Sequence, residues 1–125
     1  MKPTESELAI LNVLWKKGPS TVRTVNTELS RKRRVGYTNT LKMMQLMHDK
    51  GLLERDESRR SHVYAPLPDP EDIKKSAIRH IVETVFEGNT AQLMLKALGT
   101  YTPSPAELDE IRKTLESMEN KENDD

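Results

Sequence analysis

Residues 37–51 read YTNTLKMMQLMHDKG, and no other stretch constrains the fold of this chain as strongly. Leu41, Met44 and Met47 recur at intervals of three, which places them on one side of an α-helix. Gly51 ends the pattern, as glycine often does just after a helix. The opposite side is polar, and it is formed by Thr38, Asn39 and Lys42.

Two helices are predicted before this stretch, of which the second is short. Thr4 and Glu7 form a capping-box pattern, which favours a helix that runs to about Lys17. A Gly-Pro pair ends that helix, and Ser20 or Thr21 can cap a second one. The apolar residues of both helices recur at helical spacing, so each helix has one side to bury against its neighbours.

Two short β-strands are predicted after the third helix. Residues 52–56 and 61–65 flank a polar turn at residues 57–60, and Val63 and Tyr64 favour extended backbone. Three helices followed by a β-hairpin are the element order of a winged helix-turn-helix. The third helix of that fold can enter the major groove of DNA, beside the hairpin, or wing.

Three prolines between residues 66 and 70 mark a boundary, because proline interrupts both helices and strands. We predict a winged helix-turn-helix domain over residues 1–68 and a helical arm over residues 69–119. Residues 120–125 are charged and lack apolar anchors, so a frayed tail is expected. The predicted fold class is therefore mostly α with a small β-hairpin: a DNA-binding domain plus a three-helix dimerisation arm.

Each of the three helices predicted in the arm has an apolar stripe. In the last helix, Leu108, Ile111, Leu115 and Met118 are spaced by three, four and three residues, which resembles a coiled-coil seam. Such stripes need covering, and a second copy of the chain is the simplest cover. The predicted dimer interface consists of Ile78, Val82, Phe86, Leu93, Leu98, Ile111, Leu115 and Met118.

The formal net charge of zero hides an asymmetry between the two halves of the chain. Residues 1–66 carry 13 Lys or Arg against 7 Asp or Glu, and residues 67–125 carry 7 against 13, so the halves have net charges of +6 and −6. A basic half suits double-stranded DNA, since each neutralised phosphate releases counterions. Only 34% of the residues are hydrophobic and 32% are charged, which favours a core completed by a partner subunit.

Candidate DNA contacts follow from side-chain chemistry and position. Asn39 can pair with adenine, Lys42 can donate to guanine and Thr38 can contact a thymine methyl, so these three are predicted to contact bases. Each residue also has a plainer interpretation, as part of a solvated loop or an exposed helix side, but their coincidence in one fold favours DNA. The predicted contacts to the DNA backbone are Arg31, Lys32, Arg33, Arg34, Tyr37, Arg59 and Arg60.

Motifs for catalysis and metal binding are missing from the sequence. It has no cysteine, which excludes disulfides, thiolate nucleophiles and cysteine metal sites. Its histidines, His48, His62 and His80, show no helical metal pairing, and no nucleophile elbow is present. We therefore predict no enzyme activity, no cofactor and no bound metal. The chain has no apolar run long enough to span a bilayer and no signal-peptide pattern, so a cytoplasmic protein without membrane insertion is predicted.

The sequence resembles the penicillinase-repressor (BlaI/MecI-type) family over nearly its whole length. The resemblance is carried mainly by YTNTL at 37–41 and MHDKGLLER at 47–55, which match the recognition helix and the start of the wing. The motifs are specific through their common order and spacing, and none is diagnostic alone. Further matches are TESEL at 4–8, VLW at 13–15, VYAP at 63–66 and SPAEL at 104–108.

This resemblance implies a homodimeric repressor that binds a palindromic operator and dimerises through its C-terminal helices. Some members are released when a membrane sensor-protease system triggers cleavage in the arm. By position the matching bond is Lys96–Ala97, which departs from the Asn-Phe pair of the well-known members. Copper-responsive relatives use C-terminal cysteines, which this chain lacks. Leu46 stands where many members have arginine, so one backbone contact of the family is not expected here.

Two other functions stay open at the level of sequence. A winged helix can serve as a protein-interaction module without binding DNA, although the +6 charge of residues 1–66 argues against this function. An activator or a sensor of a small ligand would share the fold and the DNA contacts. Binding to DNA separates the first alternative from a repressor.

Overall fold

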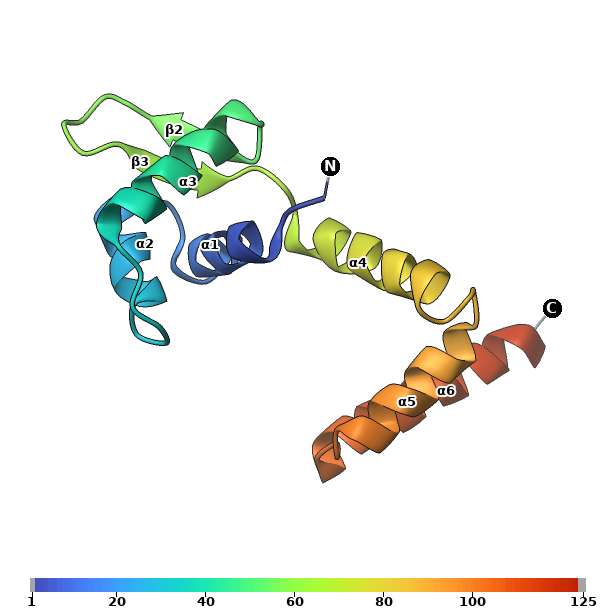
Figure 1. Cartoon of the computed structure of the whole chain (residues 1–125). Helices are drawn as coiled ribbons and strands as arrows, with labels where there is room; N and C mark the ends of the chain where they lie inside the picture. The colour runs from blue at the N-terminus through green and yellow to red at the C-terminus, as the bar shows by residue number, and fades with distance from the viewer. Residues whose placement is uncertain (1, 124–125) are drawn as a thin grey trace. The chain divides into compact units, whose positions relative to one another are not determined.

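The computed structural model describes residues 2–123 and confirms a mostly helical fold with a small antiparallel sheet (Figure 1). Within the described residues there are six α-helices and three β-strands. Three helices are interleaved with the strands, and three more follow them. The elements are α1 (Glu5–Lys17), β1 (Ser20–Thr21), α2 (Val22–Leu29), α3 (Tyr37–Asp49), β2 (Leu53–Asp56), β3 (Val63–Pro66), α4 (Pro70–Thr84), α5 (Thr90–Thr100) and α6 (Pro105–Asn123).

The chain divides into two compact units, Met1–Ala77 and Ile78–Asp125, which we call the N-terminal unit and the C-terminal unit. The division falls inside α4 and not at the proline-rich segment. That segment belongs to the N-terminal unit because the indole N–H of Trp15 donates to the carbonyl oxygen of Pro68 at 3.1 Å. The domain bounds at residues 68 and 119 stay predictions.

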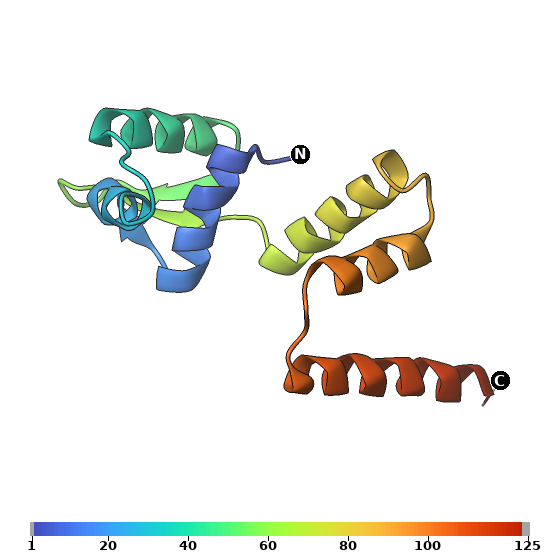
Figure 2. The same cartoon turned by 60° about the horizontal axis from the view of Figure 1, so that its bottom comes forward.

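One apolar core holds the N-terminal unit together. It forms where α1, α2 and α3 surround the small sheet (Figure 2). Met44 and Met47 of α3 are fully buried, as their spacing predicted, and Leu41 is half-buried. Burying one such side chain stabilises a fold by about 1.5–3 kcal/mol. The core consists of Ile10, Leu11, Leu14, Val22, Val25, Met44, Met47, Leu52, Leu53 and Tyr64.

The sheet has one strand more than the predicted hairpin. β1 pairs with β3 and β3 pairs with β2, all antiparallel, so the strand order is β1-β3-β2. The extra strand arises because Ser20 and Thr21 lie extended just before α2, where Thr21 is also the N-cap and accepts from the Thr24 N–H at 3.3 Å. Ser20 lies opposite Tyr64, which is 1% exposed, so the wing is anchored in the core.

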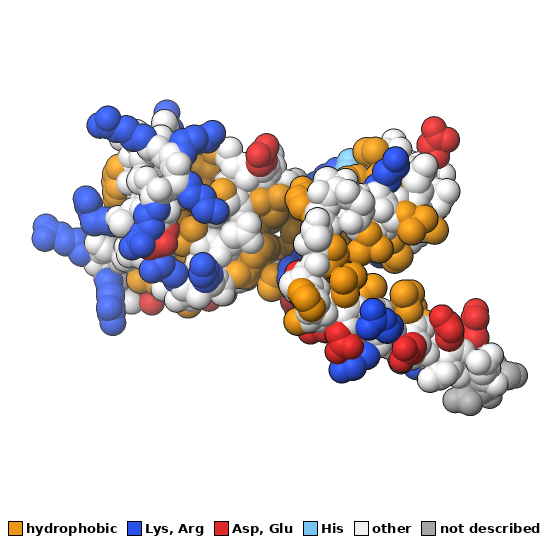
Figure 3. Space-filling view, turned by 90° about the horizontal axis from the view of Figure 1, so that it is seen from below, with side chains coloured by type: hydrophobic (Ala, Val, Ile, Leu, Met, Phe, Trp, Pro, Cys, Tyr) orange, Lys and Arg blue, Asp and Glu red, His pale blue; other side chains and the backbone are white. Residues whose placement is uncertain are grey.

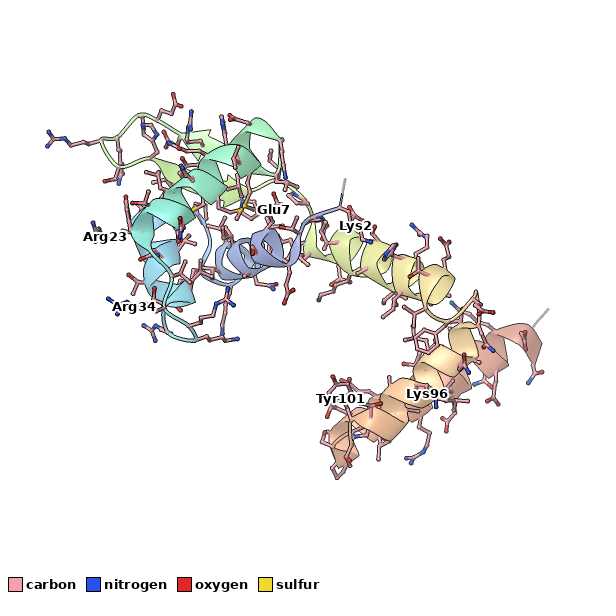
Figure 4. The ribbon with its side chains drawn as sticks, in the orientation of Figure 1. Lys2, Glu7, Arg23, Arg34, Lys96 and Tyr101 are labelled. Atoms are coloured by element: carbon pink, nitrogen blue, oxygen red, sulfur yellow. The ribbon has the colours of Figure 1, made fainter. Side chains whose placement is uncertain are left out.

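The C-terminal unit contains the end of α4 with α5 and α6, and none of its described residues is buried. Large apolar side chains remain exposed, such as Leu95 in α5, which is 69% exposed, and Tyr101 just after that helix, which is 76% exposed. Tyr101 is labelled in Figure 4. The unit therefore has apolar surface but no enclosed core of its own. Within residues 2–123, no helix combines the length and the apolar character needed to cross a bilayer.

The structure gives α6 an end at Asn123, so residues 120–123 are part of that helix; Asp124 and Asp125 lie outside the described residues. That the end of the chain frays stays a prediction. The helix persists because no proline or glycine interrupts it, and because Lys121 lies in its last turn, where a cation interacts favourably with the helix dipole.

Candidate nucleic-acid interface

The exposed side of α3 is polar. Thr38, Asn39 and Lys42, the predicted base contacts, are all exposed, whereas Met44 on the opposite side is fully buried. Gln45 was not singled out by the sequence pattern, yet it is exposed and lies about two helical turns after Thr38. Gln45 follows Lys42 by three residues and Thr38 by seven, and residues at these spacings share one side of a helix. This spacing is the signal in the sequence that could have identified it.

A hydrogen-bond network fixes the start of α3 against α2. The side-chain amide of Asn26 donates to the Val35 carbonyl at 2.9 Å and to the Thr40 hydroxyl at 3.0 Å. Thr40 is 2% exposed, and its hydroxyl donates to the Gly36 carbonyl at 3.4 Å. The network closes the turn of the helix-turn-helix. Sequence alone gave no reason to bury Thr40, since threonine is usually exposed.

An ion pair to α1 holds the other end of α3. Lys50, the C-cap of α3, donates from Nζ to Glu7 at 2.9 Å, and Glu7 is 2% exposed. The second carboxylate oxygen accepts from the Thr4 N–H at 2.9 Å, which confirms the predicted capping box. Burial raises the pKa of Glu7, but the hydrogen bonds from Thr4 and Lys50 outweigh it and leave the pKa below its ordinary value.

The loop between α2 and α3, residues 30–36, exposes all four of the predicted cationic contacts at 31–34. Arg31 is 3.2 Å from Glu28, which also pairs with Lys17, so part of its charge is already balanced. Arg34 lies at the surface of the loop (Figure 4). The loop therefore presents several cations beside the start of α3, where the backbone of a bound duplex can be reached.

The wing tip, residues 57–62, exposes Arg59 and Arg60. Asp56 shapes this turn, because its carboxylate accepts from the Ser58 N–H at 2.9 Å. Hydrogen bonds from the side chain and backbone of Ser58, with the nearby charge of Arg59, lower the pKa of Asp56. The carboxylate is thus held ionised in a turn that carries two cations at its surface.

A groove of about 420 Å³ separates α3 from the wing. Arg23, from the first turn of α2, lies with its Cζ 5.1 Å from the ring centroid of Tyr37, a favourable cation–π distance. The same groove is lined by Arg60 and His62 of the wing and by Gln45. Arg23 and His62 were not predicted, because only the fold brings these separate elements together. The groove suits an anion such as a phosphate.

A second groove, of about 430 Å³, lies on the other side of α3 against α1. Asn39 and Lys42 line this groove together with Leu46, which is 56% exposed. Asn39 therefore faces the α1 side of α3, and Tyr37 faces the wing side. The polar edge of α3 spans the surface between the two grooves.

Charge is distributed unevenly over the surface. Lys and Arg side chains gather on the N-terminal unit, at the left of Figure 3, consistent with the +6 net charge of residues 1–66. Among the described residues, no group of three His, Cys, Asp or Glu is placed to hold a metal ion. The basic surface, the wing groove and the edge of α3 together form the candidate interface.

The predicted dimer-interface residues leave apolar surface open in the single chain. Val82, Phe86 and Leu93 are half-buried. A groove of about 600 Å³ between α5 and α6 is lined mainly by apolar side chains. The more exposed members, which are 37–62% exposed, are Ile78, Leu98, Ile111, Leu115 and Met118.

The predicted cleavage pair, Lys96 and Ala97, lies inside α5, and both residues are exposed. Lys96 is visible on that helix in Figure 4. The bond between them is part of a regular helix, so the helix has to unwind locally before a protease can bind the chain in an extended form.

Comparison with known proteins identifies the family. The model of the penicillinase repressor family matches residues 3–117, which is nearly the whole chain. The chain belongs to the penicillinase repressor family. Relatives named methicillin resistance regulatory protein MecI, from Mammaliicoccus sciuri and Staphylococcus aureus (strain N315), are 20% identical over 112 residues, which cover 90% of this chain and 91% of theirs.

A solved structure of a MarR family protein from Bacillus stearothermophilus has a similar fold. It superposes with a TM-score of 0.50 at 18% identity, covering 96% of this chain and 75% of that one. The winged-helix fold and the resemblance seen in the sequence are thus confirmed. As a penicillinase repressor family member, the chain is a DNA-binding transcriptional repressor, and this family agrees with the prediction that it is not an enzyme.

Proposed function

We propose that this repressor binds a palindromic operator as a homodimer, with α3 of each subunit in a major groove. Thr38, Asn39, Lys42 and Gln45 face the base edges. The observation that carries the proposal is the polar edge of α3 on a helix held at both ends by buried contacts. Base recognition needs such rigidity, since hydrogen bonds to base edges require accurate placement.

The DNA backbone beside α3 lies in the groove between that helix and the wing. Arg23, Tyr37 and His62 hold one phosphate there, and Arg60 closes the groove from the wing. Arg59 and the cations of residues 31–34 contact neighbouring phosphates. These contacts set the register of the protein on the duplex and supply affinity that falls with salt.

The C-terminal unit joins the two subunits. Two features of this unit support the proposed dimer: its helices expose apolar stripes, and none of its described residues is buried. Pairing two such units covers the stripes of both. A two-fold dimer then presents its α3 helices to half-sites about 34–36 Å apart, or a small multiple of that distance.

Repression ends when the dimer is weakened, because one half-site alone binds far less tightly than two. Cleavage at Lys96–Ala97 by a sensor-protease system is the proposed trigger. The bond lies in α5, so cleavage separates α6 and its apolar seam from the rest of the subunit. Limited proteolysis of the free and DNA-bound protein, followed by mass analysis, tests the position of the first cut.

A mobility-shift assay tests DNA binding directly. The duplex is the region upstream of the protein's own gene, with a scrambled duplex of equal length as control, at two salt concentrations. We expect a discrete complex on the specific duplex, weakened at high salt. Equal binding to both duplexes would contradict sequence-specific recognition. Binding to neither would favour a protein-interaction module.

A further inference from the structure

The seam of α6 indicates how two subunits meet. We infer that α6 of one subunit lies antiparallel along α6 of a second copy, with the two-fold axis near Lys113. In this arrangement Leu108 faces Met118 of the partner subunit, and Ile111 faces Leu115 of the partner subunit. The inference rests on the proposed dimer and adds the direction and register of its pairing.

The seam itself limits the choices. Leu108, Ile111, Leu115 and Met118 are 41%, 37%, 52% and 62% exposed, so all four are available to a partner. Their spacing repeats every seven residues, which keeps them on one side of the helix when two helices pair. With only four seam residues, two alignments bury all of them: parallel in register, or antiparallel with Leu108 opposite Met118 of the partner subunit.

Charge favours the antiparallel alignment. The residues that flank the seam are Glu107 and Lys121 on one side and Arg112 and Glu119 on the other. Antiparallel pairing places Glu107 beside the partner's Lys121 and Arg112 beside the partner's Glu119. Because the dimer is symmetric, each pair occurs twice. These four contacts join opposite charges, and such contacts set the orientation of paired helices. The two copies of Arg112 also lie near each other beside the axis, so the repulsion between them offsets part of this gain.

Parallel pairing of the two α6 helices gives fewer contacts between opposite charges and adds a repulsion between like charges. It keeps only the contact between Glu107 and the partner's Arg112, while Glu119 faces the uncharged Thr114 of the partner subunit. Glu122 is the next seam position, so two like carboxylates would face each other. In the antiparallel alignment Glu122 instead reaches the start of the partner's α6, where the helix dipole stabilises an anion.

Apolar surface beside the seam extends the contact. The groove between α5 and α6 is lined by Met94, Leu98 and Tyr101 next to the α6 seam. A partner helix on the seam covers these side chains as well. The paired surface is therefore wider than two isolated helices, and both copies use the same residues.

The absence of cysteine from the sequence allows a direct test by cross-linking. Ile111→Cys and Leu115→Cys are made in the full chain, one of them with a size tag, then mixed, allowed to exchange subunits and oxidised. We expect a disulfide mainly in the mixed dimer. Each variant alone should cross-link poorly, because identical residues are then about 6 Å apart along the helix axis, which strains a disulfide.

Charge reversal gives an independent measurement. Arg112→Glu and Glu119→Arg should each weaken dimerisation about tenfold, and the double variant should restore it. The matched control is Lys113→Glu, the same change on the outer side of α6, which should leave the dimer nearly intact. A parallel dimer gives no rescue, since Glu119 then faces Thr114 of the partner subunit.

Sedimentation of the unmodified protein distinguishes failure of the proposed dimer from failure of the antiparallel pairing alone. A monomer at micromolar concentration would overturn the dimer and the antiparallel pairing together. A dimer in which Leu115→Cys cross-links to itself, or in which the mixed pair fails to cross-link, leaves the dimer standing and overturns the antiparallel arrangement.

Discussion

The two units of this repressor differ in how they bury their apolar side chains. The N-terminal unit encloses ten apolar side chains in a core and keeps a basic, polar exterior. The C-terminal unit buries none of its described residues and exposes apolar side chains on an acidic background. The first encloses a core of its own, whereas the second exposes the apolar surface that the proposed dimer would cover.

Breaking the C-terminal unit should have the largest effect. Leu115→Glu places a charge in the α6 seam, so the dimer should dissociate. Operator affinity should fall about a hundredfold or more, because the linkage between half-sites is lost. Sedimentation and the mobility-shift assay measure the two effects, and circular dichroism should show that the N-terminal unit stays folded.

The matched control is Ser117→Glu, on the opposite side of the same helix, which should remain dimeric and bind DNA normally. If Leu115→Glu bound the operator as tightly as the parent, the proposal that the C-terminal unit joins the two subunits would be wrong.

Within the N-terminal unit, the largest effect should come from the exposed edge of α3. Lys42→Ala removes a base contact and should cost about 1–3 kcal/mol per subunit on the operator. Binding to a scrambled duplex should change much less. Lys16→Ala removes an equal charge from α1 and serves as control. A loss that is the same on both duplexes would make Lys42 a backbone contact.

Glu7→Gln tests how firmly α3 is held. It removes the charge that faces Lys50 and should lower the free energy of unfolding of the N-terminal unit by about 2 kcal/mol. The pKa of Glu7 is depressed, so its stabilisation is fully present above the ordinary value of about 4.5 and is lost as the pH falls below it. Thermal unfolding from pH 7 to 3 should show this loss in the parent and a flatter curve in the variant.

The exposed Glu5→Gln, in the same helix turn, is the control and should leave stability within about 0.5 kcal/mol of the parent. An equal effect of the two variants would show that the buried ion pair does not stabilise the unit.

Periodic patterns predicted most of the fold. The spacing of Leu41, Met44 and Met47 fixed the inner side of α3, and the Thr4–Glu7 pattern fixed the start of α1, because these signals are local. The strand at Ser20 could not be predicted, since its partner is Tyr64, far away in the sequence. Nor did the charged end of α6 reveal that its helix continues to Asn123.

The candidate site was predictable only where one helix supplies it. Thr38, Asn39 and Lys42 share α3, so their exposure followed from helical spacing. Arg23 and His62 come from α2 and the wing, and they meet Tyr37 only through tertiary packing. Which of these residues contact DNA stays a prediction.

The smallest expected effect is at the wing tip. The salt dependence of DNA binding there tests whether the position of a cation in the N-terminal unit matters more than the total charge of the protein. Arg59→Ala should lower the slope of log affinity against log salt by about 0.9 per lost phosphate contact, on specific and scrambled duplexes alike. Arg79→Ala removes the same charge from the C-terminal unit and should leave the slope unchanged. Arg79 is part of an acidic half that DNA repels, so an equal change in both variants would mean that total charge, and not the position of the wing, determines binding.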